Sequence, residues 1–341
     1  RSIQAMPIRV AINGFGRIGR NILRSAKQAG RSDIDFVAVN DLTDAKTLAH
    51  LLKYDSVHGT YTGDVRVSDD GLVLDGDDIR VLSERDPSAL PWAELEVDIV
   101  IESTGIFRDR KGAANHLAAG AQKVIISAPG KNEDLTVVLG VNQDRYDPDE
   151  HHVISNASCT TNCLAPVASV INNNFKIDKG FMTTIHAFTN DQRILDNSHK
   201  DPRRARSAVQ SIVPTSTGAS KSIGEIIPDL KGKLEGIAMR VPVPNVSLIE
   251  FVFCTNKNLT VDKINDCLTK SSKSDLKGVL DVTNEKLVSI DFNHNSNSAI
   301  VDLSLTKVVG KGMGKISAWY DNEWGFSNRM CDLVKYIHKK V

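Results

Sequence analysis

Residues 8–23 read IRVAINGFGRIGRNIL, and this segment carries the clearest structural signal in the chain. A short apolar strand over residues 8–13 leads into a glycine-rich turn, and a helical apolar pattern follows and stops near Gly30. A second apolar strand over residues 34–40 ends at Asp41. Strand, helix and strand in this order form a βαβ unit, which requires a parallel sheet covered by helices.

The turn itself, Asn13-Gly14-Phe15-Gly16-Arg17-Ile18-Gly19, has the spacing of a dinucleotide-binding loop. Its first glycine permits the tight bend, the second lets the backbone approach a pyrophosphate, and the third lets the helix pack on the strand. Asp41 follows Gly19 by 22 residues, close to the spacing of a carboxylate that binds the ribose. Alone, the glycines also fit a structural turn and Asp41 also fits a helix cap, but together they predict dinucleotide binding.

Further along, the pattern of strands changes. Residues 64–83 alternate around two Asp/Gly turns, which predicts an antiparallel hairpin inserted into the parallel series. After about residue 155, longer strands follow one another, which predicts a mostly antiparallel sheet; they cover residues 180–186, 236–243, 247–254, 299–309 and 315–320.

We therefore expect an α/β protein with two domains. A doubly wound, Rossmann-like dinucleotide-binding domain covers residues 6–158 and is joined by a C-terminal helix over residues 325–341. An α+β catalytic domain covers residues 159–324. Residues 1–5 precede the first patterned segment and are left out of this prediction.

Composition excludes several classes of protein. Lys plus Arg equals Asp plus Glu at 42 each in 341 residues, so no long-range field attracts nucleic acid or an anionic membrane, and we expect neither partner. No apolar run approaches the roughly 20 residues that span a bilayer, and no secretory signal is evident, so we expect a cytoplasmic protein. Five cysteines in this length favour thiol chemistry over a disulfide framework.

Residues 155–163, SNASCTTNC, stand where a helix is expected to begin near Cys159. The free N–H groups and dipole of a helix N-terminus lower the pKa of a thiol, so Cys159 is a candidate nucleophile. The alternative is a small buried apolar residue, the role we expect for Cys163. A metal or redox pair would also use both cysteines, but no second Cys/His pair supports zinc, and His151-His152 point to opposite faces of a strand, so we expect no metal.

The run TTIHAFTN, residues 183–190, ends a β-rich segment with His186. A lone histidine there is more often structural, but a catalytic thiol needs an imidazole to move protons at neutral pH. Residues 200–206, KDPRRAR, and Arg240 are local cations suited to phosphate, although Arg204 and Arg206 also fit a solvated loop.

At this point the chain resembles the phosphorylating (type I) glyceraldehyde-3-phosphate dehydrogenase family, essentially from Ile8 to Val341. The segments that carry the resemblance are INGFGRIGR, LLKYDSVHG, SNASCTTNCLAP, TTIHAFTNDQ, RVPVPNVS and WYDNEWG. It implies Cys159 as nucleophile and His186 as base. It implies that substrate phosphate and inorganic phosphate are bound by Ser158, Thr160, Thr189, Arg203, Thr217, Gly218 and Arg240. It implies that NAD is held by Asn13, Gly14, Phe15, Gly16, Arg17, Ile18, Gly19, Asp41, Arg85, Ser103, Ser127 and Asn322.

The resemblance also implies a mechanism and an assembly. The Cys159 thiolate attacks the aldehyde, the hemithioacetal passes a hydride to the nicotinamide, and inorganic phosphate cleaves the resulting thioester to give an acyl phosphate. Members of the family are typically homotetramers.

One departure concerns the cofactor. Asn197-Ser198 replaces the Leu-Pro usual in NAD-specific members and resembles members that accept a 2′-phosphate, whereas Asp41 and Leu42 match the NAD-specific form. We expect NAD to be preferred, and use of NADP stays open.

Three alternative functions compete with this one. Residues 291–294 and 298–302 resemble erythrose-4-phosphate dehydrogenase, while Thr189 matches the triose enzyme. A non-catalytic NAD-binding protein would bind cofactor without forming a thioester, and a cysteine hydrolase would leave the nucleotide loop without a purpose.

Overall fold

The strand, turn and helix of the opening segment are present in the computed structural model, which describes residues 6–340; the residues 1–5 left out of the prediction lie outside it. β1 (Ile8–Asn13) leads into α1 (Arg17–Gln28), and β2 (Ile34–Asn40) pairs parallel to β1 with Ile8 opposite Ile34. Gly30 has φ +63, a left-handed conformation that ends the helical segment. The predicted βαβ unit is confirmed.

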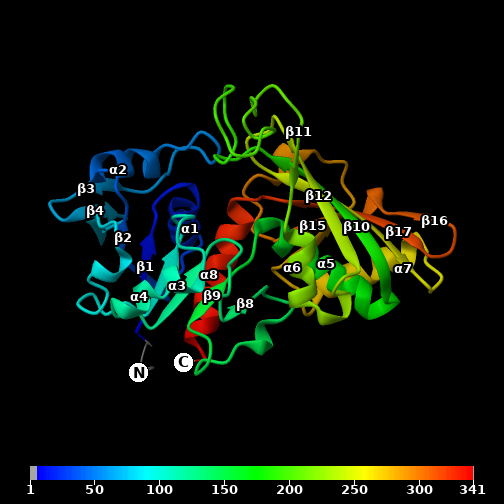
Figure 1. Ribbon diagram of the computed structural model, residues 1–341, viewed down its shortest axis with the longest axis horizontal. Coiled ribbons are helices and arrows are strands. Elements are labelled where there is room, and N and C mark those ends of the chain that lie inside the picture. The colour runs from blue at the N-terminus through cyan, green and yellow to red at the C-terminus, as the bar shows by residue number, and fades with distance from the viewer. Residues whose placement is uncertain (1–5, 341) are drawn as a thin grey trace. The chain divides into compact units, whose positions relative to one another are not determined.

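The first sheet has the strand order β3-β4-β5-β2-β1-β6-β7-β9-β8. Figure 1 labels β3, β4, β2, β1, β9 and β8 of this sheet. β2 and β6 flank β1 on opposite sides, so the strand order reverses there, and the carboxyl ends of these strands border a crevice suited to a ligand. The predicted hairpin is confirmed, and its last strand also pairs parallel to β2. The remaining strands are β3 (Val65–Val67), β4 (Gly71–Leu74), β5 (Asp77–Leu82), β6 (Ile99–Glu102), β7 (Lys123–Ile126), β8 (Leu135–Thr136) and β9 (Val153–Ser155).

The strands of this sheet are apolar on both faces, as a parallel sheet between helices requires. Val10, Ile12, Val100, Ile101 and Val124 are all completely buried. The elements that accompany the sheet are α2 (Ala45–Lys53), the short α3 (Arg110–Ala113) and α4 (Asn115–Ala118), and the 3-10 turns Pro87–Ala89 and Gln143–Arg145.

The second sheet has the order β11-β12-β10-β13-β17-β15-β14, with β16 paired to β17. Most neighbours are antiparallel, as predicted, but β10 pairs parallel to β12 and β14 parallel to β15. The strands are β10 (Ile177–Ala187), β11 (Val213–Ser216), β12 (Leu234–Val241), β13 (Ser247–Thr255), β14 (Leu280–Thr283), β15 (Ala299–Asp302), β16 (Lys307–Val309) and β17 (Met313–Tyr320). The single strand expected over residues 299–309 is wrong: Asp302 caps a 3-10 turn, Leu303–Leu305, that breaks it.

Helices α5 (Cys159–Phe175), α6 (Ala219–Ile226) and α7 (Val261–Lys273) accompany this sheet, with 3-10 turns at Pro228–Leu230 and Ser289–Phe292 (Figure 1). Val252 and Cys254 of β13 are partly exposed, whereas Phe251 and Phe253 are buried, so only one face of the strand is fully covered.

The last helix is α8 (Trp324–His338). Among the described residues, internal packing groups 6–137, 144–157 and 327–340 into one compact unit. Residues 138–143 and 158–326 form a second. We propose that these units are the dinucleotide-binding and catalytic domains. Among residues 6–340, no helix combines the length and hydropathy needed to span a bilayer.

Candidate active site

Cys159 is the first residue of α5, the helix start expected from the sequence. Ser158 caps this helix, because its Oγ accepts a hydrogen bond from the Thr161 N–H at 3.0 Å. Cys159 Sγ lies 3.6 Å from Nε2 of His186, near the end of β10. The structure therefore brings together the two side chains proposed as nucleophile and base.

Arg240 lies beside His186 because β10 and β12 run parallel with these two residues in register. Its Nη1 is 2.5 Å from His186 Nδ1 and donates to the carbonyl oxygen of Ala187 at 3.0 Å. The same carbonyl oxygen lies 2.7 Å from His186 Nδ1. The Arg240 guanidinium only donates, so Nδ1 faces one donor and one acceptor; Nε2 is free to accept the thiol proton in the tautomer whose Nδ1–H donates to Ala187.

The protonation of this pair differs from the expectation. Burial and the positive charge of Arg240 lower the pKa of His186 to about 3. Burial also raises the pKa of Cys159, although Arg240 and hydrogen bonds from Thr160 act to lower it. The expected lowering of the Cys159 pKa by the helix N-terminus is wrong here, because desolvation of the thiolate outweighs it. These effects favour a thiol beside a neutral imidazole.

Tyr320, at the end of β17, links the helix of the nucleophile to the strand of the base. Its hydroxyl lies 2.8 Å from Thr160 Oγ1 and 2.8 Å from Thr184 Oγ1. All three residues are buried, and the Tyr320 ring also meets the ring of His186 edge-on at 5.9 Å. This network holds Thr160 and His186 in place around Cys159.

Asn322 is positioned in the second unit by Ser247. The Ser247 hydroxyl donates to Asn322 Oδ1 at 2.9 Å and accepts from the Ala187 N–H at 3.0 Å. With Oδ1 engaged, the Nδ2 group is the remaining hydrogen-bonding group of this buried side chain.

Only some of the expected phosphate-binding residues contact Cys159 or His186. Arg240 and Thr160 touch the Cys159 and His186 cluster as described. Thr217 and Gly218 precede α6, and Thr217 Oγ1 accepts from the Ala219 N–H at 3.2 Å. Thr189 is partly buried just after β10, and the Arg203 side chain is exposed, with no ion pair to residues 6–340. Arg206 pairs with Asp196 and its side chain is 68% exposed, which fits the alternative of a solvated loop, whereas Arg204 pairs with Asp191 and Asp201 and is only 21% exposed.

A hollow of about 340 Å³ lies at the carboxyl ends of β1, β2 and β6. Of the expected cofactor residues, it is lined by Asn13, Gly14, Gly16, Asp41, Arg85 and Ser103. A Cβ on Gly14 would lie 2.6 Å from the Thr104 nitrogen, whereas a Cβ on Gly16 would meet nothing within 4 Å. Gly16 therefore leaves its backbone open to a ligand at the N-terminus of α1, an arrangement that fits a pyrophosphate.

Five other expected cofactor residues do not line the hollow: Phe15, Arg17, Ile18, Gly19 and Ser127. The Phe15 side chain is buried, and its N–H donates to Asp41 Oδ2 at 2.9 Å. Arg17 is turned away into an ion pair with Asp55 at 3.0 Å. A Cβ on Gly19 would lie 2.3 Å from the Gly14 oxygen, so only glycine lets the helix pack this closely on the loop. The Ser127 hydroxyl lies 2.9 Å from the Ser103 hydroxyl and supports it. Ile18 does not line the hollow.

Sequence reasoning assigned no cofactor contact to six residues that line the hollow: Asn40, Leu42, Glu84, Thr104, Ile106 and Phe107. Their common signal is position, since each lies at or just after the carboxyl end of β2, β5 or β6.

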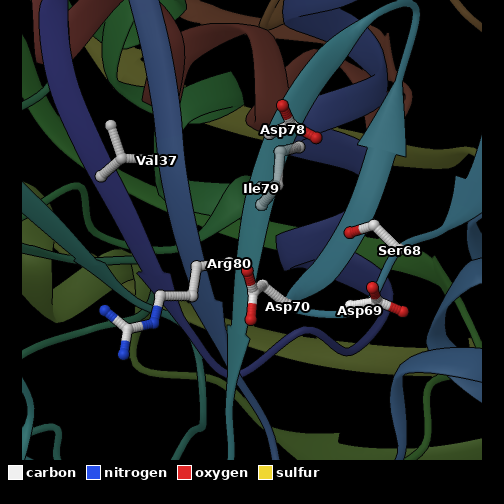
Figure 2. A pocket seen from close by; sticks show the side chains of 7 residues that line it. All are labelled: Val37, Ser68, Asp69, Asp70, Asp78, Ile79 and Arg80. Atoms are coloured by element: carbon white, nitrogen blue, oxygen red, sulfur yellow. The ribbon is translucent and has the colours of Figure 1, made fainter.

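Another hollow, of about 610 Å³, is lined by side chains of β2, β5 and the turn before β4 (Figure 2). Asp69, Asp70 and Asp78 contribute carboxylates to it, and Arg80 is paired with Glu94. This acidic lining does not suit a phosphate. Within the described chain, no three His, Cys, Asp or Glu side chains gather in a geometry that would hold a metal ion.

Comparison with known proteins agrees with this arrangement. The family model described as "Glyceraldehyde 3-phosphate dehydrogenase, NAD binding domain" matches residues 8–110, and the C-terminal domain of the same family matches residues 158–322. A glyceraldehyde-3-phosphate dehydrogenase of Geobacillus stearothermophilus is 57% identical over 335 residues, which cover 98% of this chain and 99% of the relative. The chain belongs to the glyceraldehyde-3-phosphate dehydrogenase family.

Other relatives from this family are similar at comparable levels. Glyceraldehyde-3-phosphate dehydrogenase 1 of Bacillus subtilis (strain 168) is 55% identical over 335 residues, with 98% and 99% of the two chains covered. Glyceraldehyde-3-phosphate dehydrogenase 2 of Trichormus variabilis is 53% identical over 334 residues, again with 98% and 99% covered. The match extends over both units of the fold.

Proposed function

We propose that the chain is an NAD-dependent glyceraldehyde-3-phosphate dehydrogenase, which converts D-glyceraldehyde 3-phosphate and inorganic phosphate to 1,3-bisphosphoglycerate, as in glycolysis and gluconeogenesis. The observation that carries this proposal is the 3.6 Å separation of Cys159 Sγ and His186 Nε2 at the start of α5. The family membership supplies the substrate class, because the relatives carry this name.

The two residues divide the chemistry. Cys159 Sγ attacks the aldehyde carbon, and the thiol proton passes through His186 Nε2 to the aldehyde oxygen to give a hemithioacetal. Bound NAD supplies the hydride acceptor. As the hydride leaves, the hemithioacetal hydroxyl returns its proton to Nε2, and the acyl group stays on Sγ as a thioester. Inorganic phosphate then attacks the thioester carbon and displaces Sγ, which takes the proton back from Nε2 and restores the thiol; the phosphate proton goes to solvent, and the product is an acyl phosphate instead of a free acid.

The lowered pKa of His186 keeps its imidazole neutral at pH 7, and a pKa of about 3 also makes the imidazole a weak base. An imidazole that is neutral at pH 7 is ready to accept a proton, whereas an imidazolium is not. Arg240 contributes to keeping His186 neutral and offers its guanidinium to an anionic substrate, and we assign it, with Ser158, Thr160, Thr189, Arg203, Thr217 and Gly218, to phosphate binding.

For NAD we assign the hollow lined by Asn13, Gly14, Gly16, Asp41, Arg85 and Ser103, with support from Phe15, Arg17, Ile18, Gly19 and Ser127, and Asn322 as a further donor. The Asp41 carboxylate would repel a 2′-phosphate, so NAD is the preferred cofactor.

We also propose a homotetramer in the cytoplasm. Ile194, Leu195 and Ile212 are 69%, 72% and 68% exposed, and apolar side chains gathered on one loop region favour burial against another copy. A catalytic thiol needs a reducing compartment. Light scattering after size-exclusion chromatography would measure the mass of the assembly, and a monomer would contradict the first proposal.

The deciding experiment is a spectrophotometric assay of cofactor reduction with glyceraldehyde 3-phosphate, phosphate and each cofactor in turn, with erythrose 4-phosphate as the competing substrate. Cys159→Ala is expected to abolish turnover and leave NAD binding intact, while Cys254→Ala serves as a matched control and keeps turnover. Faster turnover of the tetrose, or cofactor reduction by Cys159→Ala, would contradict the proposal.

A further inference from the structure

A buried hydrogen-bond network adjoins the dinucleotide hollow, and its central side chains have no part in the reaction above. Its centre is Glu102, the last residue of β6, which is 2% exposed. Glu102 Oε2 accepts from Asn13 Nδ2 at 2.6 Å and lies 2.9 Å from His116 Nε2. Oε1 accepts from the Thr104 N–H at 2.8 Å and from the Thr104 hydroxyl at 2.5 Å. Four donors therefore surround one buried carboxylate.

Trp92 determines which nitrogen of His116 carries the proton. An indole N–H only donates, and Trp92 Nε1 lies 2.9 Å from His116 Nδ1, so Nδ1 is the acceptor. The hydrogen of the neutral ring is then on Nε2, where it donates to Glu102. Both rings are 0% exposed, so water does not offer either of them another partner.

The network extends from Glu102 into the lining of the hollow. Asn13 Oδ1 accepts from Asn40 Nδ2 at 2.7 Å, and Asn40 exchanges two hydrogen bonds of 2.8 Å with the backbone of Glu84. Thr104 Oγ1 accepts from the Ile106 N–H at 3.0 Å. These five residues, Asn13, Asn40, Glu84, Thr104 and Ile106, all line the hollow. One carboxylate thus ties together the ends of three strands and the loops that follow them.

We propose that Glu102, oriented by His116 and Trp92, is the positioning group of the dinucleotide site. Gly14 packs directly against the Thr104 backbone, so the glycine loop takes its place from the Thr104 peptide that Glu102 holds. Burying a carboxylate is costly unless every oxygen is paired, which makes this arrangement an unusual choice for simple packing. The inference rests on the proposed function for the identity of the ligand.

The first test is Glu102→Gln, which keeps the shape of the side chain. Donors face both oxygens of Glu102, so either orientation of the new amide places an NH2 group against donors, at Thr104 or at Asn13 and His116. We expect the Kd for NAD, measured by calorimetry without substrate, to rise about 10- to 100-fold. Thr136→Val, a change of similar size elsewhere in the first unit, is the control and keeps the wild-type Kd.

The second test uses Trp92→Phe to release the tautomer of His116. With the indole N–H gone, the proton can move to Nδ1, and Nε2 can accept from the amide that Glu102→Gln introduces. We therefore expect Trp92→Phe/Glu102→Gln to bind NAD more tightly than Glu102→Gln alone. A role in packing alone predicts that the two losses add. In wild type, nitrogen NMR of the His116 ring is expected to show the proton on Nε2.

The outcomes separate this inference from the proposed function. If wild type binds NAD and Glu102→Gln binds it equally well, or if the two losses add, the positioning role is wrong and the enzyme assignment stands. If wild type binds no NAD, the proposed function itself fails. Should Glu102→Gln not fold, the NMR measurement on wild type decides, and a proton on Nδ1 overturns the inference. Alkylation of Cys159 by iodoacetamide at the wild-type rate verifies that each variant keeps an intact second unit.

Discussion

Removal of one buried hydroxyl, in Tyr320→Phe, tests how the nucleophile and the base are held together. The Tyr320 hydroxyl lies 2.8 Å from both Thr160 Oγ1 and Thr184 Oγ1, and the three residues are 1%, 5% and 1% exposed. The substitution deletes both hydrogen bonds and leaves two threonine hydroxyls in the interior without this partner.

The expected cost follows from that geometry. Each buried polar group deprived of its partner costs about 1–3 kcal/mol, so we expect Tyr320→Phe, which affects two such groups, to lower the free energy of unfolding by about 2–6 kcal/mol. For a unit of this size, each kcal/mol shifts the melting temperature by about 2–4 °C, which gives a fall of roughly 4–24 °C.

Thermal unfolding measured by calorimetry, together with the rate of Cys159 alkylation, provides the assay. Tyr54→Phe is the matched control, because Tyr54 is 53% exposed and its substitution is expected to change stability by less than about 0.5 kcal/mol. The triple variant Thr160→Val/Thr184→Val/Tyr320→Phe removes all three polar groups and is expected to be more stable than Tyr320→Phe alone. A Tyr320→Phe protein as stable as wild type would refute the reasoning.

Three further predictions concern the base, the cofactor and pH. His186→Asn is expected to lower kcat by about 10²–10⁴-fold and to slow alkylation of Cys159 at neutral pH; wild-type rates in both assays would exclude the pairing. Asp41→Asn keeps an oxygen for the Phe15 N–H and removes the charge, so kcat/KM for NADP relative to NAD is expected to rise. Asp41→Ala removes the oxygen as well and is expected to weaken the binding of both cofactors. Identical behaviour of the two variants would count against Asp41 both holding the loop and repelling a 2′-phosphate. Burial acts to raise the pKa of Asp55, but hydrogen bonds from His58 and Val57 and the Arg17 ion pair outweigh it and lower the pKa to about 2. A depressed carboxyl pKa stabilises the fold at pH values above the ordinary carboxyl pKa, and this contribution is lost as the pH falls from about 4 to 2. The difference in unfolding free energy between wild type and Asp55→Asn, measured by denaturant titration, is therefore expected to shrink across that window. A difference that stays constant would disprove the prediction.

Much of this protein is readable from local sequence. The βαβ unit over residues 8–40, the glycine loop, Asp41 and the helix that begins at Cys159 all depend on neighbouring residues, because periodicity, glycine spacing and helix capping act over a few positions. The resemblance to a family then assigned roles that no local rule supplies.

Tertiary structure decided which of these groups meet and how they are charged. Arg240 reaches His186 only because β12 pairs parallel to β10 in that register, and Glu84, Thr104 and Ile106 line the hollow only because their strands end at the same edge of the sheet. The direction of the Cys159 pKa and the bonds from Trp92 through His116 to Glu102 likewise depend on burial by distant segments. Strand order, register and desolvation are sums over the whole chain, so a local pattern of residues does not contain them.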